Sequence, residues 1–277
     1  MEKIMANIIK ELNARGYETT DTVVIKNGVI MFGVIIGSED IRPTIYVNEF
    51  IKNGLSVAEI SDKIIEMYEQ AMEDMPDINI PEITSWDYAK DNLLLCVQKK
   101  SSEDIIKKDF LDLEVYVRVK VRVKITNGSY KVNSCNLQKL GITEEELFKR
   151  AYEVTKENIF IEDMRKAMAQ LMGFSVDEIP LSPEDMLLVL SNKEKSYGAS
   201  AILFPDVLKS IAEEYNSNLV ILPSSIHECI IKFDDMPNAE VYNNMVREVN
   251  ENEVLPEEVL SDHAYRFDRK SGKVEVM

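Results

Sequence analysis

The stretch LDLEVYVRVKVRVKI, residues 111–125, decides the fold class of this sequence. Every odd position holds leucine, valine or isoleucine, and the even positions hold Asp112, Glu114, Tyr116, Arg118, Lys120, Arg122 and Lys124. Side chains alternate with period two only in a β-strand, so the stretch predicts one long strand with an apolar face. At about 3.3 Å per residue it would span about 50 Å, and we therefore expect a bend or a bulge within it.

Hairpins and amphipathic helices surround this strand. Asn27-Gly28 stands between two β-branched runs and fits a two-residue type I′ turn. Asn127-Gly128 offers a second hairpin turn after the long strand. Residues 4–15 and 56–75 carry apolar side chains at helical spacing, and Gly16 follows the first of them as a C-cap. Helices and hairpins therefore alternate in the first half of the chain.

The second half repeats this mixture. Thr143 and Glu146 form a capping box that predicts the start of one helix. A second helix is expected from about residue 161 and would carry Met164, Met168 and Met172 on one side. Strands are expected at 199–204 and 226–233.

A further helix at 240–249 would place Val241, Met245 and Val249 on one side. The whole pattern predicts an α+β fold with mixed, mainly antiparallel sheets packed with helices. We expect two units, an N-terminal α+β unit at 1–140 and a C-terminal α+β unit at 141–277.

The net charge and the amino-acid composition indicate which kinds of partner and which cellular compartment to expect. The chain holds 32 Lys and Arg against 49 Asp and Glu, a formal net charge of −17 that disfavours nucleic acid and anionic membranes as partners. The opening MEKIMANIIKELNARG lacks the pattern of a signal peptide, and no stretch reaches the roughly 18 apolar residues of a membrane span. The three cysteines, Cys96, Cys135 and Cys229, have no CxxC spacing, which fits a reducing compartment. These features predict a cytoplasmic protein.

The best candidate for catalysis is the segment LPSSIHECI, residues 222–230. On a strand, Ser225, His227 and Cys229 would share one face, and a hydroxyl or thiol beside an imidazole is the minimum for nucleophilic catalysis. The same residues also fit a turn followed by a half-buried histidine, because the segment has no GxSxG elbow and no assignable acid. We favour the structural interpretation and expect no catalytic residue.

No cofactor or metal site is expected. The sequence has no P-loop and no GxGxxG, and His227 and His263 are too far apart to suggest a zinc site. The row Arg118, Lys120, Arg122 and Lys124 is the one basic stripe of the chain. It could bind nucleic acid or an acidic partner, but a solvated sheet face explains it more simply.

Several longer stretches carry a family resemblance. KNGVIMFGVII, PTIYVNEF, DFLDLEVYVRVKV, YGASAILFPDVLKSIAEEYNSNLVILPSSIHECII and MVREVNENEVLPEEVLSDHAYRFDR together resemble the domain-of-unknown-function 5688 family of gut Clostridia. The resemblance implies a bacterial cytosolic protein and transfers no catalytic residue, because the family has no established activity.

Two functions of different class follow from the sequence. We expect a non-enzymatic protein-binding or regulatory module with a protein partner, because no catalytic constellation stands out. The alternative is a hydrolase-like enzyme that uses Ser225 or Cys229 with His227, which requires a pocket and a third polar group oriented on His227. DNA binding through residues 118–124 ranks third, and the oligomeric state stays open.

Overall fold

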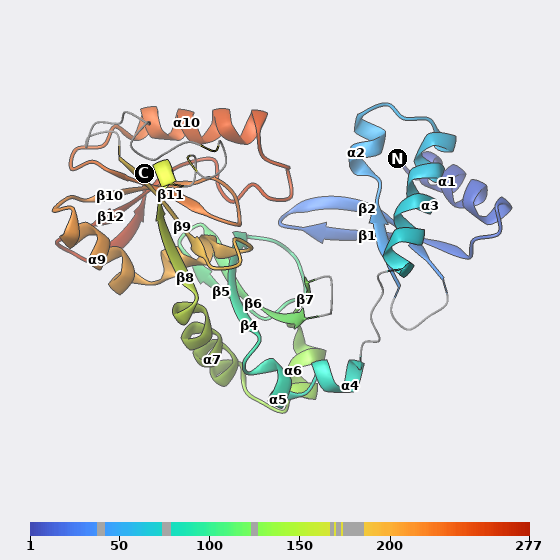
Figure 1. Ribbon diagram of the computed structural model, residues 1–277, viewed down its shortest axis with the longest axis horizontal. Helices are drawn as coiled ribbons and strands as arrows, with labels where there is room; N and C mark the ends of the chain where they lie inside the picture. The colour runs from blue at the N-terminus through green and yellow to red at the C-terminus, as the bar shows by residue number, and fades with distance from the viewer. Residues whose placement is uncertain (38–41, 74–78, 123–126, 167–168, 170–172, 174–185) are drawn as a thin grey trace. The chain divides into compact units, whose positions relative to one another are not determined.

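The computed structural model describes residues 1–37, 42–73, 79–122, 127–166, 169, 173 and 186–277. The chain divides into two compact units, the first built mainly from residues 1–78 and the second from 79–121 and 128–277 (Figure 1). The expected boundary at 140/141 does not coincide with this division. The reason is a continuous core in the second unit, where Leu95 and Val117 share one cluster with Leu147 and Leu190.

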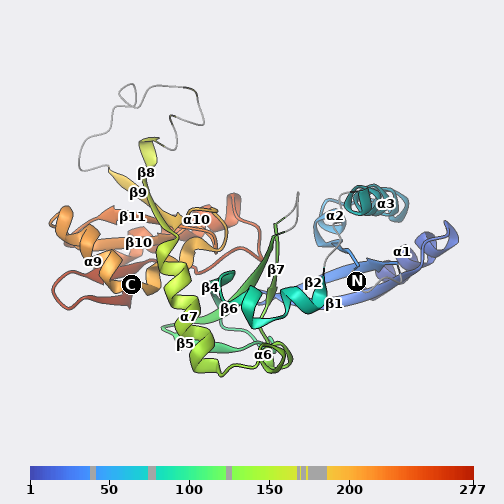
Figure 2. The same ribbon diagram turned by 60° about the horizontal axis from the view of Figure 1, so that its bottom comes forward.

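The first unit is a three-stranded antiparallel sheet covered by helices. The strands β1 (Thr19–Lys26), β2 (Val29–Ile36) and β3 (Thr44–Tyr46) lie in sequence order. The helices α1 (Glu2–Ala14) and α3 (Val57–Glu73) pack on one face (Figures 1 and 2), and α2 (Asn48–Lys52) links β3 to α3. The core between helices and sheet holds Ile8, Leu12, Val34, Ile36 and Ile64, among others.

The first hairpin confirms the turn predicted from the sequence. Lys26 pairs with Val29, so Asn27 and Gly28 form the connection. Their φ angles of 48° and 79° are the positive values that a type I′ turn requires. Asparagine and glycine tolerate this backbone best, which explains why this dipeptide sets the register of the hairpin.

The first sheet of the second unit is organised around β6 (Leu113–Arg122). Strand β4 (Leu93–Lys99) borders β6 on one side, and β5 (Lys107–Phe110) and β7 (Asn127–Lys131) also pair with β6. The same unit contains three short helices, α4 (Ile80–Ile83), α5 (Trp86–Ala89) and α6 (Ser134–Leu140), and the longer helix α7 (Glu144–Glu157). The predicted capping box of α7 is confirmed, since Glu146 N–H donates to Thr143 Oγ1 and Thr143 N–H donates to the Glu146 carboxylate.

The second sheet of this unit has six strands in the order β13-β12-β10-β11-β9-β8. The strands are β8 (Ile159–Asp163), β9 (Leu187–Asn192), β10 (Leu219–Pro223), β11 (Cys229–Phe233), β12 (Tyr265–Asp268) and β13 (Lys273–Val276). Helix α10 (Ala239–Asn252) packs through Tyr242 and Val246 against Val220 of this sheet (Figure 1). Leu219 and Ile221 join the main core with α9 (Pro205–Glu214). All pairings with a described register are antiparallel, which confirms the α+β fold.

The described part of the long alternating stretch forms the single strand that was predicted, β6, except for its first two residues. Phe110 of β5 pairs with Leu113 of β6, so Leu111 and Asp112 form a tight turn, and Leu111 has φ of 55°. The alternation itself cannot reveal this turn, because its residues continue the apolar and polar sequence. The expected second turn at Asn127-Gly128 is also wrong, because both residues belong to β7.

Two other segments differ from the expected secondary structure. Residues 199–204, expected as a strand, lie largely in the 3₁₀ helix η3 (Gly198–Leu203). A short buried apolar run has the same pattern in either state, which explains the error. The helix expected from residue 161 is wrong at its start, since Ile159–Asp163 pairs with β9; Met168 and Met172 lie outside the described residues. Among the described helices, none has the length and apolar character needed to cross a membrane.

Candidate functional site

The segment around His227 is a connection between strands. Strand β10 ends at Pro223 and β11 begins at Cys229, so residues 224–228 lie outside the sheet. The expected strand at 226–233 therefore starts three residues late, and Ser225, His227 and Cys229 do not share a strand face. One proline and two serines before His227, Pro223-Ser224-Ser225, favour a turn, as the structural interpretation of the sequence predicts.

Both ring nitrogens of His227 are engaged. Its Nδ1 accepts the Tyr197 N–H at 3.0 Å, and its Nε2 lies 3.3 Å from Glu258 Oε1. The Ser225 hydroxyl oxygen accepts the backbone N–H of His227 at 3.0 Å and makes no described contact with the imidazole. A general base needs a nitrogen free to take the proton of the nucleophile. The arrangement therefore orients the loop rather than activating Ser225.

Cys229 is fully buried on β11. Burial raises the pKa of the Cys229 thiol well above its ordinary value, with Glu228 adding to the effect. Burial also raises the pKa of Cys96 to about 12. Since the thiolate is the reactive form, neither sulfur is suited to nucleophilic attack near neutral pH.

Thiol labelling checks this interpretation. We expect iodoacetamide to modify the folded protein only at Cys135, the exposed cysteine on α6, and all three cysteines after unfolding in guanidinium. Intact mass before and after unfolding measures the number of adducts. The variant Cys135→Ser is the control and should stay unmodified while folded. Rapid labelling of Cys229 in the folded protein would contradict the structure and restore weight to the hydrolase alternative.

The basic row on β6 turns inward where it is described. Arg118 Nε donates to Ser129 Oγ at 2.8 Å, and its guanidinium lies 4.6 Å from the centre of the Tyr197 ring. Lys120 Nζ lies 2.8 Å from Glu194 Oε1. The side chains of Arg122 and Lys124 lie outside the described residues. The charged groups of Arg118 and Lys120 thus have partners within the chain, which contradicts the expected solvated face at these two residues. Glu114 and Tyr116 of the same strand are buried.

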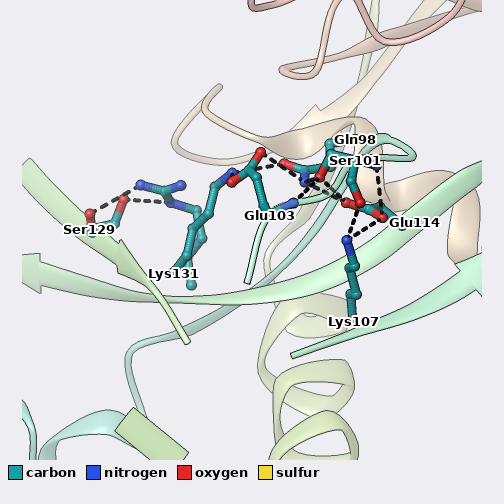
Figure 3. Close-up of polar contacts among 8 residues, drawn as sticks. Gln98, Ser101, Glu103, Lys107, Glu114, Ser129 and Lys131 are labelled. Atoms are coloured by element: carbon teal, nitrogen blue, oxygen red, sulfur yellow. Dashed lines mark hydrogen bonds and ion pairs between the residues drawn. The ribbon is translucent and has the colours of Figure 1, made fainter. Parts of the chain in front are cut away.

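Glu114 is the centre of a buried polar network on this face (Figure 3). Its side chain is 5% exposed. Its Oε1 accepts from Gln98 Nε2 at 2.7 Å and from Ser101 Oγ at 2.8 Å, and its Oε2 lies 3.1 Å from Lys107 Nζ. Burial alone would raise the pKa of Glu114, but these donors outweigh burial and hold the pKa below its ordinary value.

Lys131 joins the network through Gln98 and Glu103 (Figure 3). Its ammonium donates to Gln98 Oε1 at 2.9 Å, forms an ion pair with Glu103, and lies 4.9 Å from the centre of the Tyr116 ring. Burial lowers the pKa of Lys131, and Glu103 opposes that effect. Because the carboxylates and ammonium groups of this cluster are paired with one another, its role is to join β4, β5, β6 and β7. Elsewhere in the described ranges too, no cluster of three His, Cys, Asp or Glu side chains could hold a metal ion.

The outer face of α10 carries an apolar row. Val241, Met245 and Val249 are 47%, 48% and 42% exposed and follow one another at a spacing of four residues. Sequence reasoning placed these three on one side of the helix, but only the structure shows that Tyr242 and Val246 are the buried residues instead. Residues 234–258 hold eight carboxylates and a single arginine. The apolar row therefore lies in an acidic surrounding, a combination typical of an interaction surface.

A groove lies between α1 and β1 in the first unit. Its volume is about 780 Å³, and it is lined by Met5, Ala6 and Ile9 of α1 and by Val23 of β1 and Phe32 of β2, among others. Val23 is 58% exposed although it lies at the middle of a strand. No sequence pattern predicts this groove, because β1 has the pattern of an ordinary β-branched strand.

These features define an α+β protein of two units whose exposed apolar surfaces, rather than a catalytic constellation, stand out in the part that the structure describes. The chain belongs to a family of unknown function, DUF5688, whose model matches residues 1–269. This match confirms the resemblance seen in the sequence. Neither the curated proteins nor the solved structures contain a match to the chain.

Proposed function

We propose that this protein is a non-enzymatic protein-binding module of the bacterial cytoplasm that binds its partner through the outer face of α10. The observation that carries the proposal is the exposed row Val241, Met245 and Val249. Apolar side chains at this spacing match the anchors by which helices pack against one another. The module would act by holding a partner rather than by changing a bond.

The surrounding charge indicates the chemistry of that partner. Since the segment 234–258 is strongly acidic, a partner helix with an apolar row flanked by Lys and Arg fits it best. Nucleic acid is disfavoured by the same charge. The described contacts favour this proposal over the hydrolase alternative, because both nitrogens of His227 are engaged and Cys229 is buried.

Affinity capture from the native host tests this proposal. The tagged chain would be incubated with cytosol, with and without nuclease, and bound proteins would be identified by mass spectrometry and then purified for a direct binding titration. We expect one stoichiometric protein partner that survives nuclease treatment. Met245→Glu should weaken its binding at least tenfold, because it removes an apolar contact worth about 1.5–3 kcal/mol and adds charge beside the existing acids.

The matched control is Asn244→Glu. Asn244 is exposed on the same helix and next to Met245 but off the apolar row, so the substitution adds the same charge without removing an apolar contact. We expect Asn244→Glu to bind nearly as well as the unchanged protein. Equal binding by Met245→Glu, or a partner released by nuclease, would contradict the proposal.

A further inference from the structure

Strand β1 presents an unpaired backbone edge. In the antiparallel pair with β2, Gly37 N–H donates to Glu18 C=O at 3.0 Å, so Glu18 belongs to a hydrogen-bonded position. Hydrogen-bonded and non-hydrogen-bonded positions alternate along such a pair. The N–H and C=O groups of Thr20, Thr22 and Val24 therefore point toward β2. Those of the odd residues of β1 point away from it.

The free part of this edge has clear limits. The N–H of Thr19 also points outward, and it donates to Asn13 Oδ1 at 3.2 Å, which closes that end of the strand. Asp21, Val23 and Ile25 follow, and within the described ranges no other strand pairs with β1 beyond β2. Prolines and β-bulges are two features by which proteins prevent an edge strand from pairing. Thr19–Lys26 contains no proline and pairs with β2 without a bulge, so neither feature blocks this edge. Three successive outward positions can thus accept an added strand.

The groove beside α1 lies where the side chains of an added strand would point. Asp21 and Val23 line it together with Phe32, which pairs with Val23 in the register of the hairpin. Residues directly opposite one another in a sheet point to the same face. A strand hydrogen-bonded to Asp21, Val23 and Ile25 would therefore direct every second side chain over this groove.

The charged side chains that line the groove indicate which extended peptides would bind there. The groove is lined by two carboxylates, Glu2 and Asp21, and by one ammonium group, Lys10. Within the described part of the chain, Glu2 and Asp21 have no ion pair. A basic side chain opposite Asp21 is therefore favoured. A second copy of this chain is disfavoured, because it would bring together two molecules of net charge −17.

We propose that β1 binds an extended peptide segment by antiparallel strand addition, with apolar residues opposite Ile25 and Val23 and a Lys or Arg opposite Asp21. Main-chain hydrogen bonds would supply affinity, and the groove and Asp21 would supply specificity. This site lies in the first unit and is separate from the face of α10, so each proposal can fail without the other.

A synthetic peptide tests the proposal directly. The probe is the fluorescein-labelled peptide Thr-Ile-Thr-Val-Thr-Lys-Thr-amide, whose isoleucine, valine and lysine would lie opposite Ile25, Val23 and Asp21. We expect saturable binding by fluorescence anisotropy. N-methylation of the valine nitrogen should weaken binding about tenfold, because it removes one interstrand hydrogen bond and blocks close approach. N-methylation of the third threonine, whose N–H would point away from β1, is the matched control and should change binding little.

Two protein variants complete the test. Val23→Pro removes the outward N–H without breaking a bond to β2, and it should reduce binding about tenfold while the thermal unfolding curve stays cooperative. Asp21→Lys should weaken binding of the probe and strengthen binding of the same peptide with glutamate in place of lysine.

Three outcomes would overturn the proposal. The first is no saturable binding by the probe at millimolar concentration. The second is equal loss of affinity from both N-methylated peptides. The third is a concentration-dependent dimer abolished by Val23→Pro, which would assign the edge to a second copy of the chain.

Discussion

Replacing Gly198 with alanine is expected to lower the free energy of unfolding by about 3 kcal/mol. A Cβ at this position would lie 2.3 Å from Ser191 Oγ, 2.5 Å from the Asn192 nitrogen and 2.8 Å from the His227 carbonyl oxygen. Two of these atoms belong to the backbone, so the strain cannot be relieved by a side-chain rotation. Overpacking of this kind costs about 1–3 kcal/mol, and the displaced Ser191 Oγ would also lose its 2.8 Å bond to His227 C=O, worth about 1 kcal/mol.

Thermal and chemical denaturation measure this effect, and the chain contains a matched control. Gly128 lies on β7 with its nearest neighbour, Val121 Cβ, at 3.9 Å from an added Cβ, so Gly128→Ala should stay within about 0.5 kcal/mol of the unchanged protein. Adding Ser191→Ala to Gly198→Ala should recover only part of the loss, because the Asn192 nitrogen remains. If Gly198→Ala were as stable as the control, the junction between β9 and η3 would have space for an added Cβ, and the prediction would be wrong.

The second large effect is expected from Glu114→Gln, which keeps the shape of the side chain and removes its charge. At pH 7 the variant should be about 2–3 kcal/mol less stable, because the Lys107 ammonium loses its buried counterion and the Gln98 and Ser101 donors lose a charged acceptor. Urea denaturation at several pH values measures the difference.

The pH dependence separates this electrostatic effect from a packing defect. The pKa of Glu114 is lower in the folded protein than in the unfolded chain, so its contribution is complete above the unfolded value of about 4.5 and is lost as the pH falls through the folded value. The difference between the variant and the unchanged protein should therefore shrink as the solution is acidified. Glu275→Gln, at an exposed position on β13, is the control and should change stability little at any pH. A difference that persists in acid would contradict the role of the charge.

The elements with strong local signals were predictable from the sequence. Helix α1 follows from its spacing of apolar residues, α7 from the capping box of Thr143 and Glu146, and the first hairpin from Asn27-Gly28. Each of these depends on interactions within a few residues, which a sequence displays directly. Taken together, these helices and hairpins indicate the mainly antiparallel α+β fold class.

Features that depend on contacts between residues far apart in the sequence were not predictable in this way. The even positions of β6 have the pattern of a solvated face, and their burial requires Gln98 and Ser101 of β4 and its following loop, together with Lys107 of β5. For the same reason the sequence pattern of Ser225 and His227 resembles that of a catalytic pair, although Tyr197 and Glu258 engage both nitrogens of the imidazole. The exposure of Val241, Met245 and Val249 likewise depends on which side of α10 meets the sheet.

The network of Figure 3 constrains how this sequence can diverge. Because Glu114 pairs with Lys107 and Glu103 pairs with Lys131 at positions that are at most partly exposed, replacing one member alone removes the counterion of its partner. Relatives that alter one member should therefore alter its partner as well, either by exchanging the signs of the charges or by replacing the pair with apolar residues of similar volume. Across the family, these positions are expected to covary as pairs, whereas exposed charges such as Glu275 should drift independently.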